Sequence, residues 1–194
     1  MLCKVEKAMT SVRAEREFTE RKRAEAILTT NEIVVSTKSD IDALSSRGYG
    51  SVENEKLKLT FYESLFLLDK GLIEIKQKKT KKALDFQGVL QLFRAKDDNA
   101  WAKYLTYRDL RSRGYVVRSG FGLGVDFRLY ERGEYGKDAA EYIVYGIQEG
   151  KPVPMKELAN ALKFALSAKK KLVLAVLNRR GEVVYYSLSK LMMR

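Results

Sequence analysis

The sequence predicts an α+β fold, a mixed α/β arrangement with a small N-terminal α/β domain and a C-terminal domain built on a mixed, mainly antiparallel sheet flanked by helices. After residue 113 the spacing of apolar residues changes from the helical period of 3.6 to the period of 2 that is typical of strands. The excess of basic residues also rises in the second half. We expect the boundary near residues 95–99, with domains at 1–97 and 98–194.

Helix starts in the N-terminal half are marked by two capping-box patterns, in which a Ser or Thr is followed three residues later by an acid. Ser39 pairs with Asp42, and Thr60 pairs with Glu63. Glycines at 48 and 71 are expected to end these two helices. The other expected elements are a charged helix over 2–28, strands over 32–37 and 56–60, a basic connector over 73–82 and a helix over 82–95.

The C-terminal half is expected to begin with a helix and to continue mainly with strands. Asp97, Asp98 and Asn99 can cap a helix that runs to about Arg113. A second helix is expected over 154–168, because Pro154 suits a first helical turn. Strands are expected over 115–119, 125–131, 140–147, 171–178 and 182–188, with hairpin turns at 120–124 and 178–181.

Composition excludes several classes of chemistry. The 194 residues include no histidine and one cysteine, Cys3, so a thiolate cluster, a zinc site and a triad with an imidazole base are not expected. No run approaches the ~20 apolar residues of a membrane span. The N-terminal sequence lacks the apolar core of a signal peptide, which favours a cytoplasmic location.

The formal charge of +12 is unevenly distributed along the chain. Residues 1–98 hold 19 Lys and Arg against 16 Asp and Glu, whereas residues 99–194 hold 18 against 9. The second half also contains nine of the eleven tyrosines. A localised basic surface favours a polyanion partner through counterion release. The alternative is the solubilising, lysine-rich surface of a thermophile protein.

Two segments of the C-terminal half carry residues suited to chemistry on RNA phosphate. The stretch YLTYRDLRSRGYVVRSGFGLGVDFRLYERG, residues 104–133, places Tyr130 where a strand should end. Forty residues later, Lys169, Lys170 and Lys171 precede the apolar strand LVLAVL. The simpler readings are a half-buried packing tyrosine and three solvated lysines.

These segments, together with EYIVYG and VVYYSLS, resemble the archaeal tRNA-intron splicing endonucleases over residues 99–194. The resemblance extends more loosely to GYG at 48–50 and to LTFYESLFLLDKGLIEI at 59–75. It implies a C-terminal nuclease domain that cuts precursor tRNA at a bulge–helix–bulge without a metal or cofactor. Attack by the 2′-hydroxyl on the adjacent phosphate would leave 2′,3′-cyclic phosphate and 5′-hydroxyl ends.

The resemblance also implies three catalytic positions, of which one is altered. Tyr130 and Lys170 match the family's tyrosine and lysine, but Ala139, three residues before Tyr142, stands where the family has histidine. Retention of Tyr130 and Lys170 favours an inactivated His-to-Ala form made by design. The alternative is a naturally non-catalytic, structural RNA-binding subunit of the same heteromeric endonuclease.

The reaction needs a base for the 2′-hydroxyl, and the substrate needs residues that bind RNA. A phenol is a poor base near neutral pH, its reference pKa being about 10, and a neighbouring lysine ammonium would favour the phenolate. Lys163 lies where the family often places an arginine that stacks on a bulged base. The full set of expected RNA-binding residues is Arg128, Lys163, Lys169 and Lys171.

The resemblance implies an assembly, because two cuts need two active sites at a fixed separation. A two-plus-two heterotetramer with a structural endonuclease subunit and self-association into a homotetramer both fit. The family docks an acidic loop on its neighbour, and the matching segment, 146–152, holds one acid, Glu149. The strand VVYYSLS is expected to pair edge to edge. A weaker alternative is a general RNA-binding protein that stacks single-stranded bases on its sheet.

Overall fold

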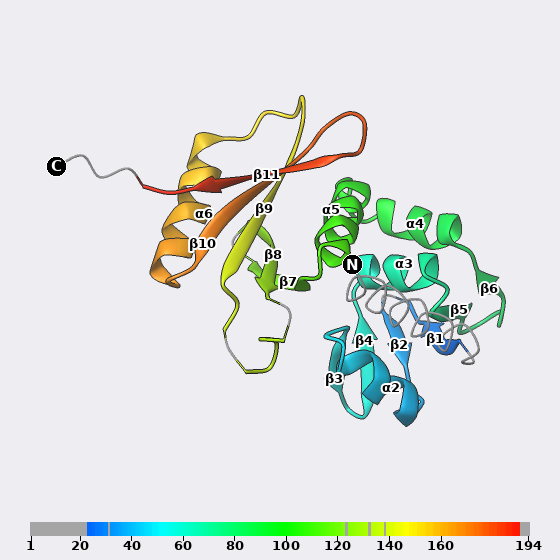
Figure 1. Ribbon diagram of the computed structural model, residues 1–194. Helices are drawn as coiled ribbons and strands as arrows, with labels where there is room; N and C mark the ends of the chain where they lie inside the picture. The colour runs from blue at the N-terminus through cyan, green and yellow to red at the C-terminus, as the bar shows by residue number, and fades with distance from the viewer. Residues whose placement is uncertain (1–22, 31, 123, 132, 138, 191–194) are drawn as a thin grey trace, which may run out of the picture.

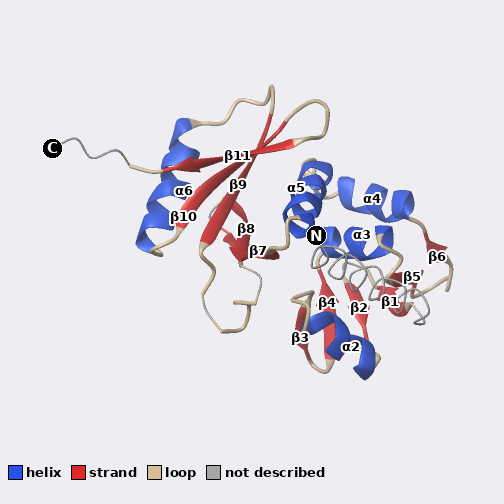
Figure 2. Ribbon diagram, viewed as in Figure 1, coloured by secondary structure: helices blue, strands red, loops and turns tan. Residues whose placement is uncertain are grey.

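The computed structural model describes residues 23–30, 32–122, 124–131, 133–137 and 139–190. They form two mixed sheets with helices packed between and around them (Figures 1 and 2). This confirms the predicted α+β fold class. Within the described residues, no helix combines the length and apolar character needed to cross a bilayer.

The N-terminal sheet has six strands in the order β3-β4-β2-β1-β5-β6. All neighbouring pairs are antiparallel except β1 and β5, which run parallel with Ala26 opposite Ile75. Its strands are β1 (Ala24–Leu28), β2 (Ile33–Val35), β3 (Ser51–Glu53), β4 (Lys56–Leu59), β5 (Ile73–Gln77) and β6 (Ala83–Leu84). The helices among the described residues of this half are α2 (Lys38–Ser45), α3 (Phe61–Asp69) and α4 (Phe86–Arg94).

The C-terminal sheet has five strands in the order β11-β10-β9-β8-β7, and only β9 and β10 run parallel. The predicted mixed, mainly antiparallel sheet is therefore correct. The described helices and strands of this half are α5 (Ala100–Ser112), β7 (Val116–Gly122), β8 (Val125–Tyr130), β9 (Tyr142–Gln148), α6 (Met155–Ser167), β10 (Lys171–Leu177) and β11 (Val183–Leu188).

One large core joins the two halves. Figure 1 shows α3, α4 and α5 gathered between the sheets, and α6 on the other face of the C-terminal sheet. The rings of Tyr62 in α3 and Tyr107 in α5 pack at a tilt, with centroids 4.9 Å apart, and Phe127 of β8 meets the Tyr62 ring edge-on with centroids 5.1 Å apart. A smaller core lies beneath α6 and includes Ala161, Ala165 and Leu172. Since α5 packs against both halves, the division at residue 97 stays a prediction.

One of the two predicted capping boxes is confirmed, and the predicted side-chain cap at Asn99 is not formed. The Thr60 hydroxyl accepts from the Glu63 N–H at 3.4 Å, while the Glu63 carboxylate accepts from the Thr60 N–H at 2.8 Å. The predicted box at Ser39 is wrong, because the N-cap residue is Thr37, two residues earlier, and its side chain makes no capping hydrogen bond.

Three other expectations require correction. Most of the expected helix over 2–28 lies outside the described residues, but residues 24–28 form strand β1, in which Ala24 and Ala26 are buried and Glu25 between them is exposed. The expected connector over 73–82 contains β5, where Ile73 and Ile75 point into the core despite the neighbouring lysines. Residues 83–84 pair with β5 as β6, so the following helix begins only at Phe86.

Candidate active site

Three distant segments meet at one end of the C-terminal sheet. Strand β8 ends at Tyr130, while β9 and β10 begin at Tyr142 and Lys171. Tyr142 lies opposite Leu129 on one side and Lys171 on the other. Because β8 runs against the other two strands, its carboxyl end lies beside their amino ends. The topology therefore gathers Tyr130, Ala139 and Lys170 at this end of the sheet.

A shallow cavity of about 280 Å³ opens at this end of the sheet and brings Ala139 and Lys170 into one lining. Ala139 is exposed and Lys170 is half-buried. Tyr130 lies beside the cavity, directly before Glu131 of its lining. The complete lining is Glu131, Glu134, Ala139, Ala140, Glu141, Lys169 and Lys170.

The three lysines are placed by the end of α6. The Lys169 N–H donates to the Leu166 carbonyl at 3.0 Å, and the Lys170 N–H donates to the Ala165 carbonyl at 2.8 Å. These two bonds form a Schellman motif. Lys169 occupies its left-handed position, with φ of 54°, where glycine is usual. A side chain there costs about 1–2 kcal/mol, so the motif fixes the backbone of Lys170 while keeping a strained lysine.

Lys171 differs from its two neighbours because its ammonium is already paired. Its Nζ lies 2.7 Å from Glu141 Oε1 and 5.3 Å from the centre of the Tyr142 ring. The hydrogen bond to Glu141 raises the pKa of Lys171, and the same bond lowers the pKa of the Glu141 carboxyl. The Glu141 carboxylate also raises the pKa of Tyr142. An RNA phosphate would therefore compete with Glu141 for Lys171.

Aromatic and basic side chains surround Tyr130 on β8. The Tyr135 ring meets the Tyr130 ring edge-on, with centroids 5.2 Å apart. Arg128 lies two residues before Tyr130, on the same face of the strand, and its Nε donates to the Ser119 carbonyl at 2.8 Å. Arg118 faces Arg128 across the β7–β8 pair.

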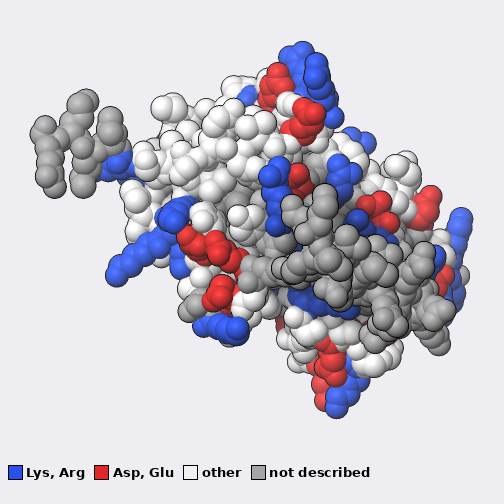
Figure 3. Space-filling model, viewed as in Figure 1, with Lys and Arg blue, Asp and Glu red and all other residues white. Residues whose placement is uncertain are grey.

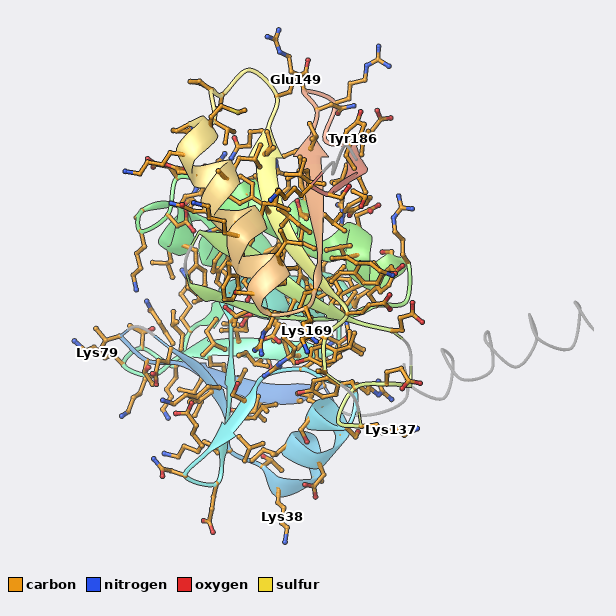
Figure 4. The ribbon with its side chains drawn as sticks, turned by 90° about the vertical axis from the view of Figure 1, so that its left-hand side faces the viewer. Lys38, Lys79, Lys137, Glu149, Lys169 and Tyr186 are labelled. Atoms are coloured by element: carbon orange, nitrogen blue, oxygen red, sulfur yellow. The ribbon has the colours of Figure 1, made fainter. Side chains whose placement is uncertain are left out.

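Two predicted residues lie away from the cavity. Lys163 is exposed on α6 and is not part of the cavity lining. Glu149 lies at the other end of the C-terminal half from Lys169, as Figure 4 shows. Its carboxylate accepts from the Arg179 N–H at 3.1 Å, so the β10–β11 loop already holds it.

Sequence reasoning missed the acidic part of the cavity. Glu131, Glu134 and Glu141 stand beside the lysines, and Figure 3 shows acidic and basic side chains next to one another on the lower part of the C-terminal half. The segment after Tyr130, ERGEYGKD, carried the signal as a cluster of acids and bases. Among the described residues, no group of three acidic, histidine or cysteine side chains is arranged to hold a metal ion.

Comparison with known proteins assigns both halves of the chain to one class of RNA-processing enzymes. Residues 24–90 match the family model of the tRNA intron endonuclease N-terminal domain. Residues 100–185 match the model of the tRNA intron endonuclease catalytic C-terminal domain.

Individual relatives agree with the two family models along most of the chain. The tRNA-splicing endonuclease of Methanococcus maripaludis is 35% identical over 171 residues, which cover 88% of this chain and 96% of that protein. The tRNA-splicing endonuclease of Pyrococcus furiosus is 33% identical over 141 residues, or 73% of this chain and 80% of that protein. The chain belongs to the tRNA-splicing endonuclease family.

Proposed function

We propose that this chain is a tRNA-splicing endonuclease subunit that binds precursor tRNA at a bulge–helix–bulge and carries an altered active site. The observation that carries the proposal is the meeting of Tyr130, Ala139 and Lys170 at one end of the C-terminal sheet. These positions come from three segments that the family resemblance had already singled out, and two of them line one cavity.

The proposed reaction is metal-independent and needs no cofactor. Tyr130 removes the proton from the 2′-hydroxyl, whose oxygen forms a bond to the adjacent phosphorus as the bond to the 5′-oxygen breaks. Lys170 stabilises the charge that builds on the non-bridging oxygens. The products are a 2′,3′-cyclic phosphate and a 5′-oxygen that requires a proton. Ala139 cannot supply that proton, so this chain cleaves slowly.

The cavity beside Ala139 has room for a larger side chain at this position. Ala139 is exposed at the cavity wall beside Lys170, so an imidazole at this position can enter without displacing core residues. Ala140, the next residue, is buried and is a poor place for a polar ring. A general acid contributes about 10²–10⁴-fold to the rate, and that is the gain expected from Ala139→His.

Single-turnover cleavage tests this proposal. A bulge–helix–bulge RNA is incubated in chelator with the unaltered chain, Ala139→His and Ala139→Gln, and the ends of the products are identified. Glutamine matches much of the size of histidine but cannot transfer the proton. The expected result is cyclic phosphate formed fastest by Ala139→His, with loss of that gain in Tyr130→Phe or Lys170→Met. Equal rates for the histidine and glutamine variants would refute the proposed role of position 139.

A second function is favoured by Ala139 itself. The chain then serves as a naturally non-catalytic, RNA-binding subunit that shapes a heteromeric endonuclease and never cuts. This alternative predicts unchanged bulge-specific RNA affinity in Ala139→His and cleavage only when a catalytic partner subunit is added. Repeating the assay with and without such a partner separates the two functions.

The proposed assembly uses the outer edge of the C-terminal sheet. Strand β11 is an edge strand, and its Val184 and Tyr186 side chains are 45% and 55% exposed. Figure 3 shows few charged side chains over the part of the molecule where β11 lies. An unpaired edge with exposed apolar residues suits pairing with another strand. Native mass spectrometry distinguishes self-association from a two-plus-two heterotetramer with a structural subunit.

A further inference from the structure

Arg118 of β7 links the N-terminal half to the neighbourhood of Tyr130. We propose that Arg118 and Tyr135 are positioning residues for the Tyr130 phenol, and that through them Glu63 of α3 sets its orientation. This inference rests on the proposed function of Tyr130. The four residues come from α3, β7, β8 and the segment after β8, which lie up to 72 positions apart in the chain.

Arg118 is held on the side of the N-terminal half by three acceptors. Its Nη1 donates to the Glu63 carboxylate and to the Gly48 carbonyl, each at 3.3 Å. Its Nη2 donates to Ser51 Oγ at 2.9 Å. The Glu63 side chain is 1% exposed and that of Arg118 is 14% exposed. A guanidinium held by three fixed acceptors at low exposure has little freedom to move.

The same guanidinium lies over the ring that touches Tyr130. Arg118 Cζ is 5.8 Å from the centre of the Tyr135 ring, within the range of a cation–π contact. The Tyr135 ring in turn meets the Tyr130 ring at an interplanar angle of 86°. Edge-to-face aromatic pairs are worth about 0.5–1.5 kcal/mol beyond the area they bury. Tyr135 is therefore a bridge between a fixed cation and the proposed base.

The contacts from Glu63 through Arg118 and Tyr135 to Tyr130 form a path, and a second contact of the N-terminal half supports it. Gly48 has φ of 77°, and a Cβ at this position would overlap Val116 and lie 3.4 Å from the Tyr135 ring. Val116 is the cross-strand partner of Tyr130 in the β7–β8 pair. The turn that contains Gly48 therefore touches both the strand partner and the ring partner of Tyr130. Neither contact involves the cavity lining, so the path approaches Tyr130 from the side of the N-terminal half.

The competing explanation is a structural one, in which Arg118 only clamps the two halves together and Tyr135 only covers a strand end. The two explanations differ in what they predict for the phenol of Tyr130. A clamp changes stability, whereas a positioning path changes the surroundings of the Tyr130 ring and transmits a change at Arg118 only while Tyr135 is present.

The test places 3-fluorotyrosine at position 130 of the full chain and follows its ¹⁹F resonance. Variants are Tyr135→Leu, Tyr135→Phe, Arg118→Lys and the double variant with leucine at 135 and lysine at 118. Arg113→Lys is the matched control, because its guanidinium also lies over a tyrosine, 5.2 Å from the centre of the Tyr185 ring. Circular dichroism checks that each variant is folded, and Tyr135→Phe keeps the ring if leucine destabilises the chain.

We expect Tyr135→Leu and Arg118→Lys to move the resonance, and Tyr135→Phe and Arg113→Lys to leave it unchanged. Arg118→Lys should have no effect once Tyr135 is leucine. A resonance unmoved by Tyr135→Leu, or an equal response to Arg118→Lys with and without Tyr135, overturns the inference.

Cleavage by the Ala139→His chain provides a second readout. Misplacement of a reacting group by about 1 Å can cost about 10²-fold in rate, so Tyr135→Leu should lower kcat by about tenfold to a hundredfold with little change in KM, and Tyr135→Phe should restore it. A cleavage-competent parent whose kcat is unaffected by Tyr135→Leu contradicts the inference. If the parent does not cleave, the proposed function fails, and the ¹⁹F result still decides whether the path to Tyr130 exists.

Discussion

The Glu63 carboxylate offers a sharp test of how the two halves are held together. It accepts four hydrogen bonds, from the Gly50 N–H at 3.1 Å, Arg118 at 3.3 Å, and both the N–H and the hydroxyl of Thr60 at 2.8 Å. Glu63→Ala leaves the Arg118 guanidinium without its counterion and two backbone N–H groups without their acceptor. Removing one member of a buried ion pair typically costs about 3–5 kcal/mol.

We expect Glu63→Ala to lower the free energy of unfolding by about 4 kcal/mol. The remaining bonds of Arg118 to Gly48 and Ser51 keep the loss from being larger. Glu63→Gln retains one acceptor oxygen and the side-chain volume, so about half of that loss is expected. The assay is urea unfolding followed by circular dichroism, at a fixed protomer concentration because association also changes apparent stability.

Glu53→Ala is the matched control for this prediction. Glu53 also forms an ion pair, with Lys58 at 2.8 Å, but its side chain is 53% exposed. Exposed pairs contribute about 0–1 kcal/mol. If Glu63→Ala and Glu53→Ala reduce stability equally, the Arg118–Glu63 contact does not hold the halves together, and the reasoning is wrong.

Three further predictions use matched pairs or a defined pH range. Gly48→Ala should lower the free energy of unfolding by about 3 kcal/mol, and Gly71→Ala by about 1 kcal/mol, in thermal unfolding. Both glycines have positive φ, but a Cβ at Gly48 would overlap Val116 of β7, whereas a Cβ at Gly71 meets open space. Equal losses of stability would exclude the contact between Gly48 and β7. Burial raises the pKa of Asp126 above its usual 3.8, so the folded state binds this proton more tightly than the unfolded state. The stability that this group contributes is present below pH 3.8 and is lost as the pH rises through the folded pKa. Asp126→Asn should remove this pH-dependent loss of stability in unfolding experiments, and an unchanged pH profile would contradict the prediction. Glu141→Gln frees the ammonium of Lys171. RNA should therefore bind more tightly in a filter-binding titration, and the slope of log affinity against log salt concentration should be steeper by about one. Glu25→Gln, which breaks the ion pair with Lys76 on the N-terminal sheet, should have no such effect in the same titration.

The fold was predictable from sequence where local chemistry agreed with the tertiary structure. Thr60 and Glu63 satisfy each other within one helical turn, so their capping box could be recognised from spacing alone. Strand β5 was missed because Lys76 and the lysines that follow the strand suggested a solvated connector. Only the alternation of Ile73 and Ile75 indicated that one of its faces is buried.

The candidate site was predictable only in part, for a related reason. The family resemblance indicated Tyr130, Ala139 and Lys170, and the order of the strands explains why they meet. The Glu141–Lys171 pair joins residues 30 positions apart, and the Glu63–Arg118 pair joins residues 55 positions apart. Spacing along the chain carries no information about such contacts, because they arise when separate elements pack together.

The position of β1 has consequences for truncation of the chain and for formation of the N-terminal sheet during synthesis. Although β1 is the first described strand, it lies inside the six-stranded sheet, with β2 on one side and β5 on the other. A truncation that removes Ala24–Leu28 would therefore split that sheet rather than trim its margin. On the ribosome, β1 must also wait for residues 73–77 to emerge before its parallel neighbour can join it.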